Sequence, residues 1–263
     1  MTAVPTRRER QRQATFDEIV DVARQLLRDG EDVSVRAVAQ EMGLTPPALY
    51  RYVDSHAELM VRVARSIFED VVAAMTTARD QQDPDDPSAQ IVASAAAFRK
   101  WALTNRNEFQ LVFASATSTA IEEAATPAPP VIDSLDACLP EESGVKLFGA
   151  FFSEIFGRLW VKYQFRIPDD SELDPELLEV LRSEIKPAEV TAGLGGPPPG
   201  MIWMFERSWS RLYGTVTLEV FGHVHPAFIT TGALFGATML DIGRELNIDG
   251  EWPRLQAVAR AQY

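Results

Sequence analysis

Residues 34–53 have the composition and spacing of a nucleic-acid contact. Two short helices are expected there, joined by a turn in which Gly43 accepts a positive φ. Three apolar side chains are expected to fill the space between these helices and the preceding one: Val38, Leu44 and Leu49. The exposed face of residues 45–51 is then free to enter the major groove of DNA.

Two other groups of polar residues could do chemistry, and both favour structural roles. His223 and His225 are two positions apart, so their rings do not share a helix face, and Pro226 follows at once. We therefore expect no metal or other cofactor. Glu154 and Arg158 are four residues apart among aromatic side chains. This spacing favours an ion pair within a helix, and a polar contact to a bound ligand is the alternative.

The net charge of −13 is distributed unevenly along the chain. Residues 1–65 contain ten Lys or Arg and ten Asp or Glu, so the whole negative excess lies in the remaining residues. Within residues 7–12, four arginines accompany a single glutamate. Such an arm can contact phosphates or a minor groove, while an acidic body stays in solvent. The alternative is an arm that is only a solvated tail.

The same sequence excludes several classes of protein. No apolar run reaches the roughly 18 residues that a membrane span needs. The N-terminal segment has no apolar stretch after its arginines, which is unlike a secretory signal. Cys138 is the single cysteine, so an intrachain disulfide is impossible. We expect a cytoplasmic protein without a membrane partner.

Helical signals position the candidate contact residues. The first helix is expected to begin near Thr15, in a capping box with Glu18, and to end at Gly30. The two short helices that follow have Ser34 and Thr45 as N-caps. Ser55 is expected to open a long amphipathic helix that extends to about residue 78.

The rest of the chain is also expected to be helical. A break at residues 81–87 marks the predicted domain boundary, and loops are expected at 127–130 and 193–200. Further helices are predicted at about 88–104, 107–116, 144–165, 174–185, 201–222 and 227–246, with a short one after Pro253. The predicted fold is all-α. Residues 1–54 would form an arm and a three-helix helix-turn-helix domain, 55–80 a connecting helix, and 81–263 an effector-binding and dimerisation domain.

Residues 14–62 resemble the TetR family of bacterial repressors. The resemblance rests on Ser-Val-Arg-Ala-Val-Ala at 34–39, Gly43-Leu44, Ala48-Leu-Tyr-Arg-Tyr-Val53 and Glu58-Leu59. It implies an all-helical homodimer that binds an operator in double-stranded DNA and a small effector. Carried over by position, the residues that would contact DNA are Ser34, Arg36, Thr45, Pro47, Ala48, Tyr50 and Arg51. Where the family often has a phosphate-binding lysine, this chain offers His56, a weaker anchor.

The C-terminal part has a fainter resemblance to a TetR subgroup whose motif contains Trp, His and Gly. The matching residues are Ser208-Trp-Ser-Arg-Leu-Tyr-Gly214 and Leu218-Glu-Val-Phe-Gly222, with Tyr213 in place of the histidine. This places residues 201–222 in the effector-binding and dimer-forming body. The last two long helices would form the dimer interface.

The aromatic residues of the body predict a mainly apolar effector held between helices. The candidate effector-binding residues are Trp101, Phe109, Phe113, Phe152, Phe156, Trp160, Phe205, Trp209 and Tyr213, with Glu154 or Arg158 as a polar contact. One alternative is a constitutive DNA-binding regulator without an effector. A less favoured alternative is an all-α enzyme, since the chain has no phosphate loop, metal-ligand cluster or catalytic triad in a familiar context.

Overall fold

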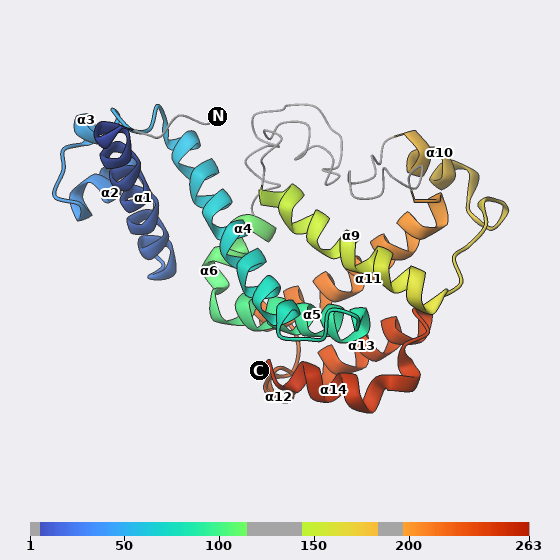
Figure 1. Cartoon of the computed structure of the whole chain (residues 1–263). Coiled ribbons are helices and arrows are strands. Elements are labelled where there is room, and N and C mark those ends of the chain that lie inside the picture. Colours follow the sequence, from blue (N-terminus) through green and yellow to red (C-terminus); the bar gives the residue numbers. More distant parts are fainter. Residues whose placement is uncertain (1–5, 115–143, 184–196, 263) are drawn as a thin grey trace. The chain divides into compact units, whose positions relative to one another are not determined.

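A computed structural model of the chain describes residues 6–114, 144–183 and 197–262 (Figure 1). Every regular element in these ranges is a helix, which confirms the predicted all-α class. The predicted break at 127–130 and the first half of the predicted loop at 193–200 lie outside the described residues. The chain divides into two compact units, Met1–Glu69 with Asn105–Ala125, and Asp70–Thr104 with Thr126–Tyr263.

The first unit contains the helix-turn-helix. Its elements are α1 (Arg7–Arg28), α2 (Val35–Glu41), α3 (Pro46–Leu49), the first part of α4 (His56–Asp80), α6 (Arg106–Phe109) and a π-helical turn at Gln110–Ala114. Helix α2 packs against both α1 and α3, and α6 packs against α1. The unit therefore joins the N-terminal helices to a segment about 80 residues away in the chain.

Helix α1 begins earlier than the sequence predicts. Its N-cap is Thr6, whose hydroxyl accepts from the Glu9 amide, while the Glu9 carboxylate accepts from the Thr6 amide. The predicted start at Thr15 is wrong, because that hydroxyl donates to the Gln11 carbonyl inside the helix. The segment between them is rich in Arg and Gln, which favour helix, and contains no residue that breaks it. The end is as predicted, with Gly30 at φ +76° directly after the C-cap.

The helix-turn-helix follows the predicted pattern with three differences. Ser34 caps α2 by accepting from the Ala37 amide at 3.1 Å, and Gly43 has φ +66° in the turn. Thr45 occupies the N-cap position of α3, but its side chain makes no capping hydrogen bond. Helix α3 ends at Leu49 instead of extending to about residue 52. Val38 and Leu49 are fully buried, as predicted. Leu44 was expected to pack between the helices with them, but it is 36% exposed.

Helix α4 begins after Ser55, whose hydroxyl accepts from the Glu58 amide at 3.1 Å. The Glu58 carboxylate accepts from the amide of Asp54 instead of from that of Ser55, so only half of the predicted capping box forms. The predicted apolar face is confirmed, since all five of its side chains are fully buried: Leu59, Val63, Ile67, Val71 and Met75. Helical periodicity alone was therefore sufficient to identify the buried side of this helix.

The second unit is built around α5 (Pro87–Thr104). Nearly all of this helix is buried, and it packs against α9 (Gly144–Tyr163), α11 (Pro199–Val220) and α14 (Trp252–Arg260). Alanines at positions 89, 93 and 95–97 let the neighbouring helices approach closely. Helix α10 (Pro175–Ser183) also packs against α11. None of the described helices is long and apolar enough to cross a membrane.

The predicted helix at 227–246 is two helices, α12 (Pro226–Thr231) and α13 (Ala233–Glu245). Gly232 separates them in the left-handed region, at φ +65°. Glycine adopts this conformation without the steric cost that a Cβ would add. Before this glycine, the hydroxyls of Thr230 and Thr231 donate to the carbonyls of Pro226 and Ala227, each four residues earlier in α12. The sequence prediction missed this interruption.

Arg99 of α5 connects four helices of the second unit. Its guanidinium donates to Glu219 of α11, at 2.5 Å from Nε to Oε2, and to the Ile229 carbonyl of α12. It also lies over the Phe235 ring of α13. Both charged side chains are buried, and burial raises the pKa of Glu219 although the contact with Arg99 opposes this shift. The pair holds α5 in register with α11 and α12.

Candidate functional site

The exposed face of α3 contains the residues predicted to contact DNA. Thr45, Pro47 and Arg51 are exposed, and Ala48 is half-buried. Tyr50 is 50% exposed, whereas its neighbour Leu49 is fully buried. The helix therefore shows one face to solvent while the other is held by the core. A short helix presented in this way can enter a major groove.

Three further predicted DNA-contact residues flank this face. Ser34 is half-buried at the N-cap of α2, and Arg36 is exposed on its first turn. His56 is exposed at the start of α4, with Nε2 at 2.7 Å from the Val33 carbonyl oxygen. That nitrogen must donate to the carbonyl, so only Nδ1 can meet a phosphate. A phosphate contact would then require the charged, doubly protonated imidazole.

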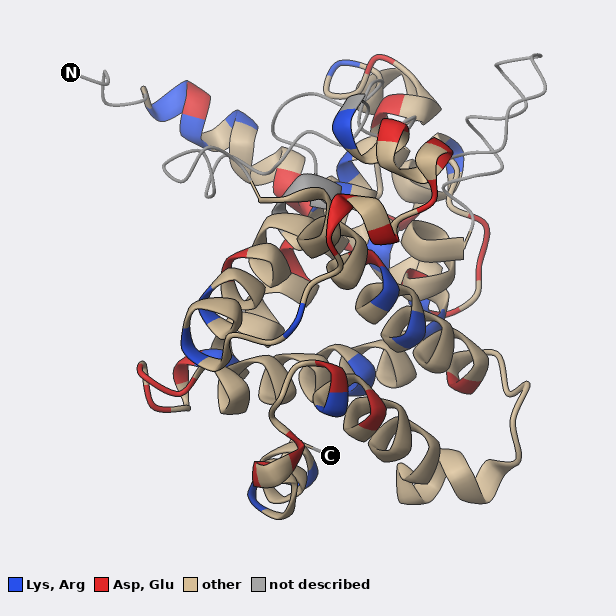
Figure 2. Ribbon diagram, turned by 90° about the vertical axis from the view of Figure 1, so that its right-hand side faces the viewer, with Lys and Arg blue, Asp and Glu red and all other residues tan. Residues whose placement is uncertain are grey.

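The arginines of residues 7–12 are exposed on the first turns of α1, not on an extended arm. Figure 2 shows these turns in blue and red directly after the N-terminus. Because a helix fixes the direction of each side chain, these arginines have less freedom to follow a groove than a disordered arm would have.

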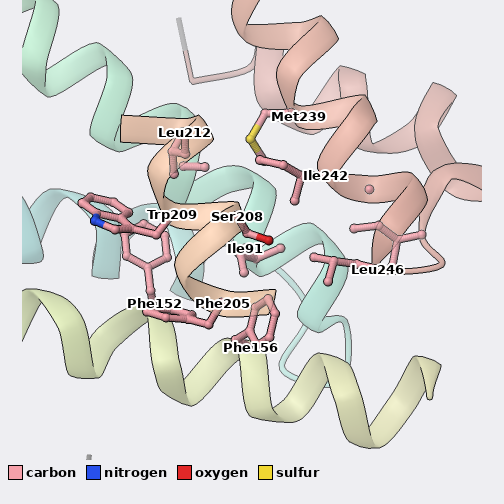
Figure 3. A pocket seen from close by; sticks show the side chains of 13 residues that line it. Ile91, Phe152, Phe156, Phe205, Ser208, Trp209, Leu212, Met239, Ile242 and Leu246 are labelled. Carbon is pink, nitrogen blue, oxygen red and sulfur yellow. The ribbon is translucent and has the colours of Figure 1, made fainter. Parts of the chain in front are cut away.

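An apolar cavity lies within the second unit, between α5, α9, α11 and α13 (Figure 3). Its volume is about 40 Å³. The lining side chains are aromatic or aliphatic apart from Ser208, whose hydroxyl donates to the Met204 carbonyl of its own helix. An apolar molecule would therefore meet little polar surface in this cavity.

The structure brings four of the predicted effector-binding residues together at the cavity: Phe152, Phe156, Phe205 and Trp209. Figure 3 shows the first two on α9 and the other two on α11. Tyr213 stacks on Trp209 at 5.5 Å between ring centroids without lining the cavity. Trp160 is half-buried on α9 and likewise lies outside the lining.

The other predicted aromatic residues lie elsewhere. Trp101 donates from its indole nitrogen to Asp70 at 3.2 Å and is not a lining residue. Phe109 and Phe113 belong to the first unit, where they stack on each other at 4.9 Å between centroids. Phe113 also meets Phe68 edge to face. These two rings form part of the core of the DNA-binding unit.

The expected ion pair between Glu154 and Arg158 does not form. Arg158 donates instead to the Gln90 side chain at 2.8 Å and to the Pro84 carbonyl, and Glu154 lies 3.9 Å from Arg79. Neither residue lines the cavity. Their partners belong to α4, α5 and the loop between them, so tertiary packing outweighs the weak i,i+4 preference.

Sequence reasoning missed the aliphatic part of the lining. These residues come from α5, from α11 and from α13 with the turn after it: Ile91, Ala95, Leu212, Met239, Ile242, Gly243, Leu246 and Ile248. Aliphatic residues at helical spacing are the ordinary content of a core. No sequence signal distinguishes those that border a cavity from those that pack fully.

The comparisons with known proteins agree with this architecture. Residues 91–242 match the family model described as Tetracyclin repressor-like, C-terminal domain. The HTH-type transcriptional regulators Rv1816 of Mycobacterium tuberculosis and Mb1846 of Mycobacterium bovis are each 28% identical to this chain over 224 residues. That alignment covers 83% of this chain and 86% of each relative.

A solved structure shares the fold. The crystal structure of SCO4313, described as a regulatory protein, superposes with a TM-score of 0.59 at 22% identity and covers 90% of this chain and 98% of that one. The family model alone spans more than half of the 263 residues. The chain therefore belongs to the TetR family and is a helix-turn-helix transcriptional regulator, not an enzyme.

Proposed function

We propose that this regulator is a ligand-responsive repressor, which binds a palindromic operator as a homodimer and releases it when a small apolar effector binds. The observation that carries the proposal is the apolar cavity inside the unit that matches the family's C-terminal domain. The protein would act in the cytoplasm. The division into residues 1–54, 55–80 and 81–263 remains our working description of its domains.

The exposed face of α3 supports sequence-specific DNA binding. Tyr50 and Thr45 would contact base edges, while Ser34, Arg36 and the protonated form of His56 would contact the backbone. In a dimer, two such faces would enter successive major grooves roughly 34–36 Å apart, or further apart on a longer operator.

The cavity lining supports a neutral effector. Carboxylate, ammonium and guanidinium groups are absent from the described residues that line it, and its one hydroxyl already donates within α11. A charged ligand would lose its hydration there without gaining a partner, which is costly. The aromatic rings from α9 and α11 would contact an apolar ligand directly.

Helices α11 and α13 support a dimer with a second copy of this chain. They pack against each other, with the Thr215 and Thr238 hydroxyls 3.0 Å apart. Gly214 of α11 and Gly236 of α13 have open space where a Cβ would lie. Glycine inside a helix costs about 1 kcal/mol relative to alanine, so an approaching partner helix would explain its use here. Leu218, 43% exposed on α11, adds apolar surface.

The test is selection of genomic DNA fragments with the purified protein, followed by titration of neutral apolar ligands against the selected operator. We expect one enriched palindrome and at least one ligand that binds in the second unit and weakens operator binding. By linkage, that ligand must bind the DNA complex more weakly by the same factor. If selection enriches no motif, the DNA-binding part of the proposal is wrong.

A constitutive DNA-binding regulator is the second candidate. The small volume of the cavity, about 40 Å³, favours it, because this space holds only a small molecule unless neighbouring side chains move. The same titration separates the two candidates. A regulator that binds its operator but responds to no ligand that enters the cavity would be constitutive.

A further inference from the structure

A buried charge cluster in the first unit joins α6 to the helices that hold the helix-turn-helix. Glu108 of α6 is fully buried, and its carboxylate accepts from Arg24 of α1, at 2.8 Å from Nε and 3.3 Å from Nη2. The Nε of Arg28, also on α1, lies 3.0 Å from the same carboxylate. Arg24 reaches α4 as well, where it donates to the Ser66 hydroxyl at 3.1 Å.

The residue before Glu108 adds a second connection. The side-chain amide of Asn107 donates to the carbonyls of Leu27 and Arg28, each at 3.1 Å. These carbonyls belong to the last turn of α1, where the regular amide donors four residues further on are missing. Two consecutive residues of α6 therefore hold the C-terminal end of α1, both by charge and by capping.

Helix α6 is covalently continuous with a wall of the cavity. Only Asn105 lies between the end of α5 and the start of α6. Helix α5 lines the cavity with Ile91 and Ala95, and its Phe98 contacts Trp209 at 5.8 Å between ring centroids. Asn107 and Glu108 therefore lie only three and four residues beyond the end of α5.

We infer that Glu108 is a positioning residue, which sets the orientation of α1 and α4 for operator binding. When the cavity is filled, a displacement of α5 reaches Glu108 through α6 and changes that orientation. The inference rests on the proposed function. Glu108 does not itself touch DNA or effector. A buried carboxylate that accepts from two arginines resists displacement from them, because separation from both would leave its charge uncompensated in the interior. Displacement of α6 would therefore be transmitted to α1.

The first test is Glu108→Gln, which keeps the volume of the side chain and removes its charge. We expect operator affinity to fall about tenfold or more, a normal size for coupling between sites. The control Ile19→Val also alters a fully buried residue of α1 and should leave the affinity of the folded protein unchanged. Equal operator affinities for Glu108→Gln and the control, with both proteins folded by circular dichroism, would overturn the positioning role.

The second test fills the cavity without a ligand. Ser208→Leu places an apolar side chain in the cavity, whereas Ser153→Leu on α9 does not, although both hydroxyls donate to a carbonyl four residues earlier. We expect Ser208→Leu to weaken operator binding and Ser153→Leu to leave it unchanged. We also expect the loss of operator affinity caused by Ser208→Leu to be at least about threefold smaller in the Glu108→Gln background. Substitutions that act through the same contacts do not have additive effects.

The outcomes separate this inference from the proposed function. If the unmodified protein selects no operator, the proposed function fails first. If the protein binds an operator and Ser208→Leu changes nothing, the route from the cavity is overturned. If the effects of Ser208→Leu and Glu108→Gln are additive, the cavity acts on DNA binding independently of Glu108, and that part of the inference is overturned.

Discussion

At the residue scale, adjacent positions in the helix-turn-helix have opposite tasks. Leu49 is fully buried and holds α3 against the core, whereas Tyr50 shows half of its surface to solvent. A β-strand would also separate such neighbours, but the caps at Ser34 and Ser55 and the turn at Gly43 specify helices. The side chain that would recognise DNA is thus held by a neighbour that never touches it.

This division predicts different outcomes for the two positions. Tyr50→Ala combined with Thr45→Ala should abolish discrimination between operator and random DNA, because a specific interaction with a base is worth about 1–3 kcal/mol. The free energy of unfolding should hardly change, since both side chains are exposed. Leu49→Ala should instead lower that free energy by about 2–5 kcal/mol. Competition binding and urea unfolding measure the two effects, and retained discrimination in the Tyr50 and Thr45 variant would contradict the assignment.

At the element scale, α1 combines two functions along one helix. Its first turns present arginines, and its last turns are held by Asn107 and Glu108 of α6. The glutamate at position 9 caps the helix, and its pKa is lowered by the hydrogen bonds from Thr6. The same helix therefore offers positive charge at one end and is anchored by α6 at the other.

Replacement of Arg7, Arg8, Arg10 and Arg12 by Gln should weaken binding to all DNA sequences alike. Glutamine maintains the helix, so the change isolates charge. For every phosphate that the variant no longer neutralises, the slope of log K against log salt should fall in magnitude by about 0.9. The matched control replaces the same residues by Lys and should keep most of the slope. An unchanged slope in the Gln variant would show that these turns are only solvated.

A second element-scale prediction concerns the break between α12 and α13. Gly232→Ala should lower the free energy of unfolding by about 1–2 kcal/mol, because a Cβ is strained at φ +65°. The control is Gly250→Ala, at a glycine of the 3₁₀ helix Asp249–Glu251 with open space around its absent Cβ and no positive φ. Thermal unfolding measures both, and equal melting temperatures would show that the backbone relaxes at Gly232.

At the scale of the whole molecule, each unit has its own buried ion pair. Arg99 and Glu219 hold α5 in the second unit, and Glu108 with Arg24 holds α6 in the first. The two anchors are nine residues apart in the chain. Removal of one partner of such a buried pair would leave the other charge uncompensated, which is strongly destabilising. The segment from α5 to α6 therefore contains one residue of a buried ion pair in each unit.

The oligomeric state yields the prediction at this scale. Leu218→Asp should convert the dimer to monomers, because it places a charge on the exposed apolar surface of α11. Val161→Asp is the control, since Val161 of α9 is 64% exposed and lies outside α11 and α13. Light scattering at micromolar concentration distinguishes the two. A monomeric unmodified protein would contradict the dimer itself.

Local sequence patterns were enough to specify the all-α class, the helix-turn-helix and the buried face of α4. These features depend on interactions between residues a few positions apart, such as caps, a turn glycine and apolar side chains at helical spacing. The start of α1 was missed because a capping box at Thr15 and the real one at Thr6 have similar sequences.

The packing of helices against one another determines which aromatic residues border the cavity and where Arg158 and Glu108 find their partners. Phe109 and Phe156 are the same residue type, yet the first lies in the core of the DNA-binding unit and the second lines the cavity. Arg24 and Glu108 are separated by 84 positions, and periodicity within either helix says nothing about that distance. Such choices depend on which helices pack together, and that packing minimises a free energy summed over the whole chain.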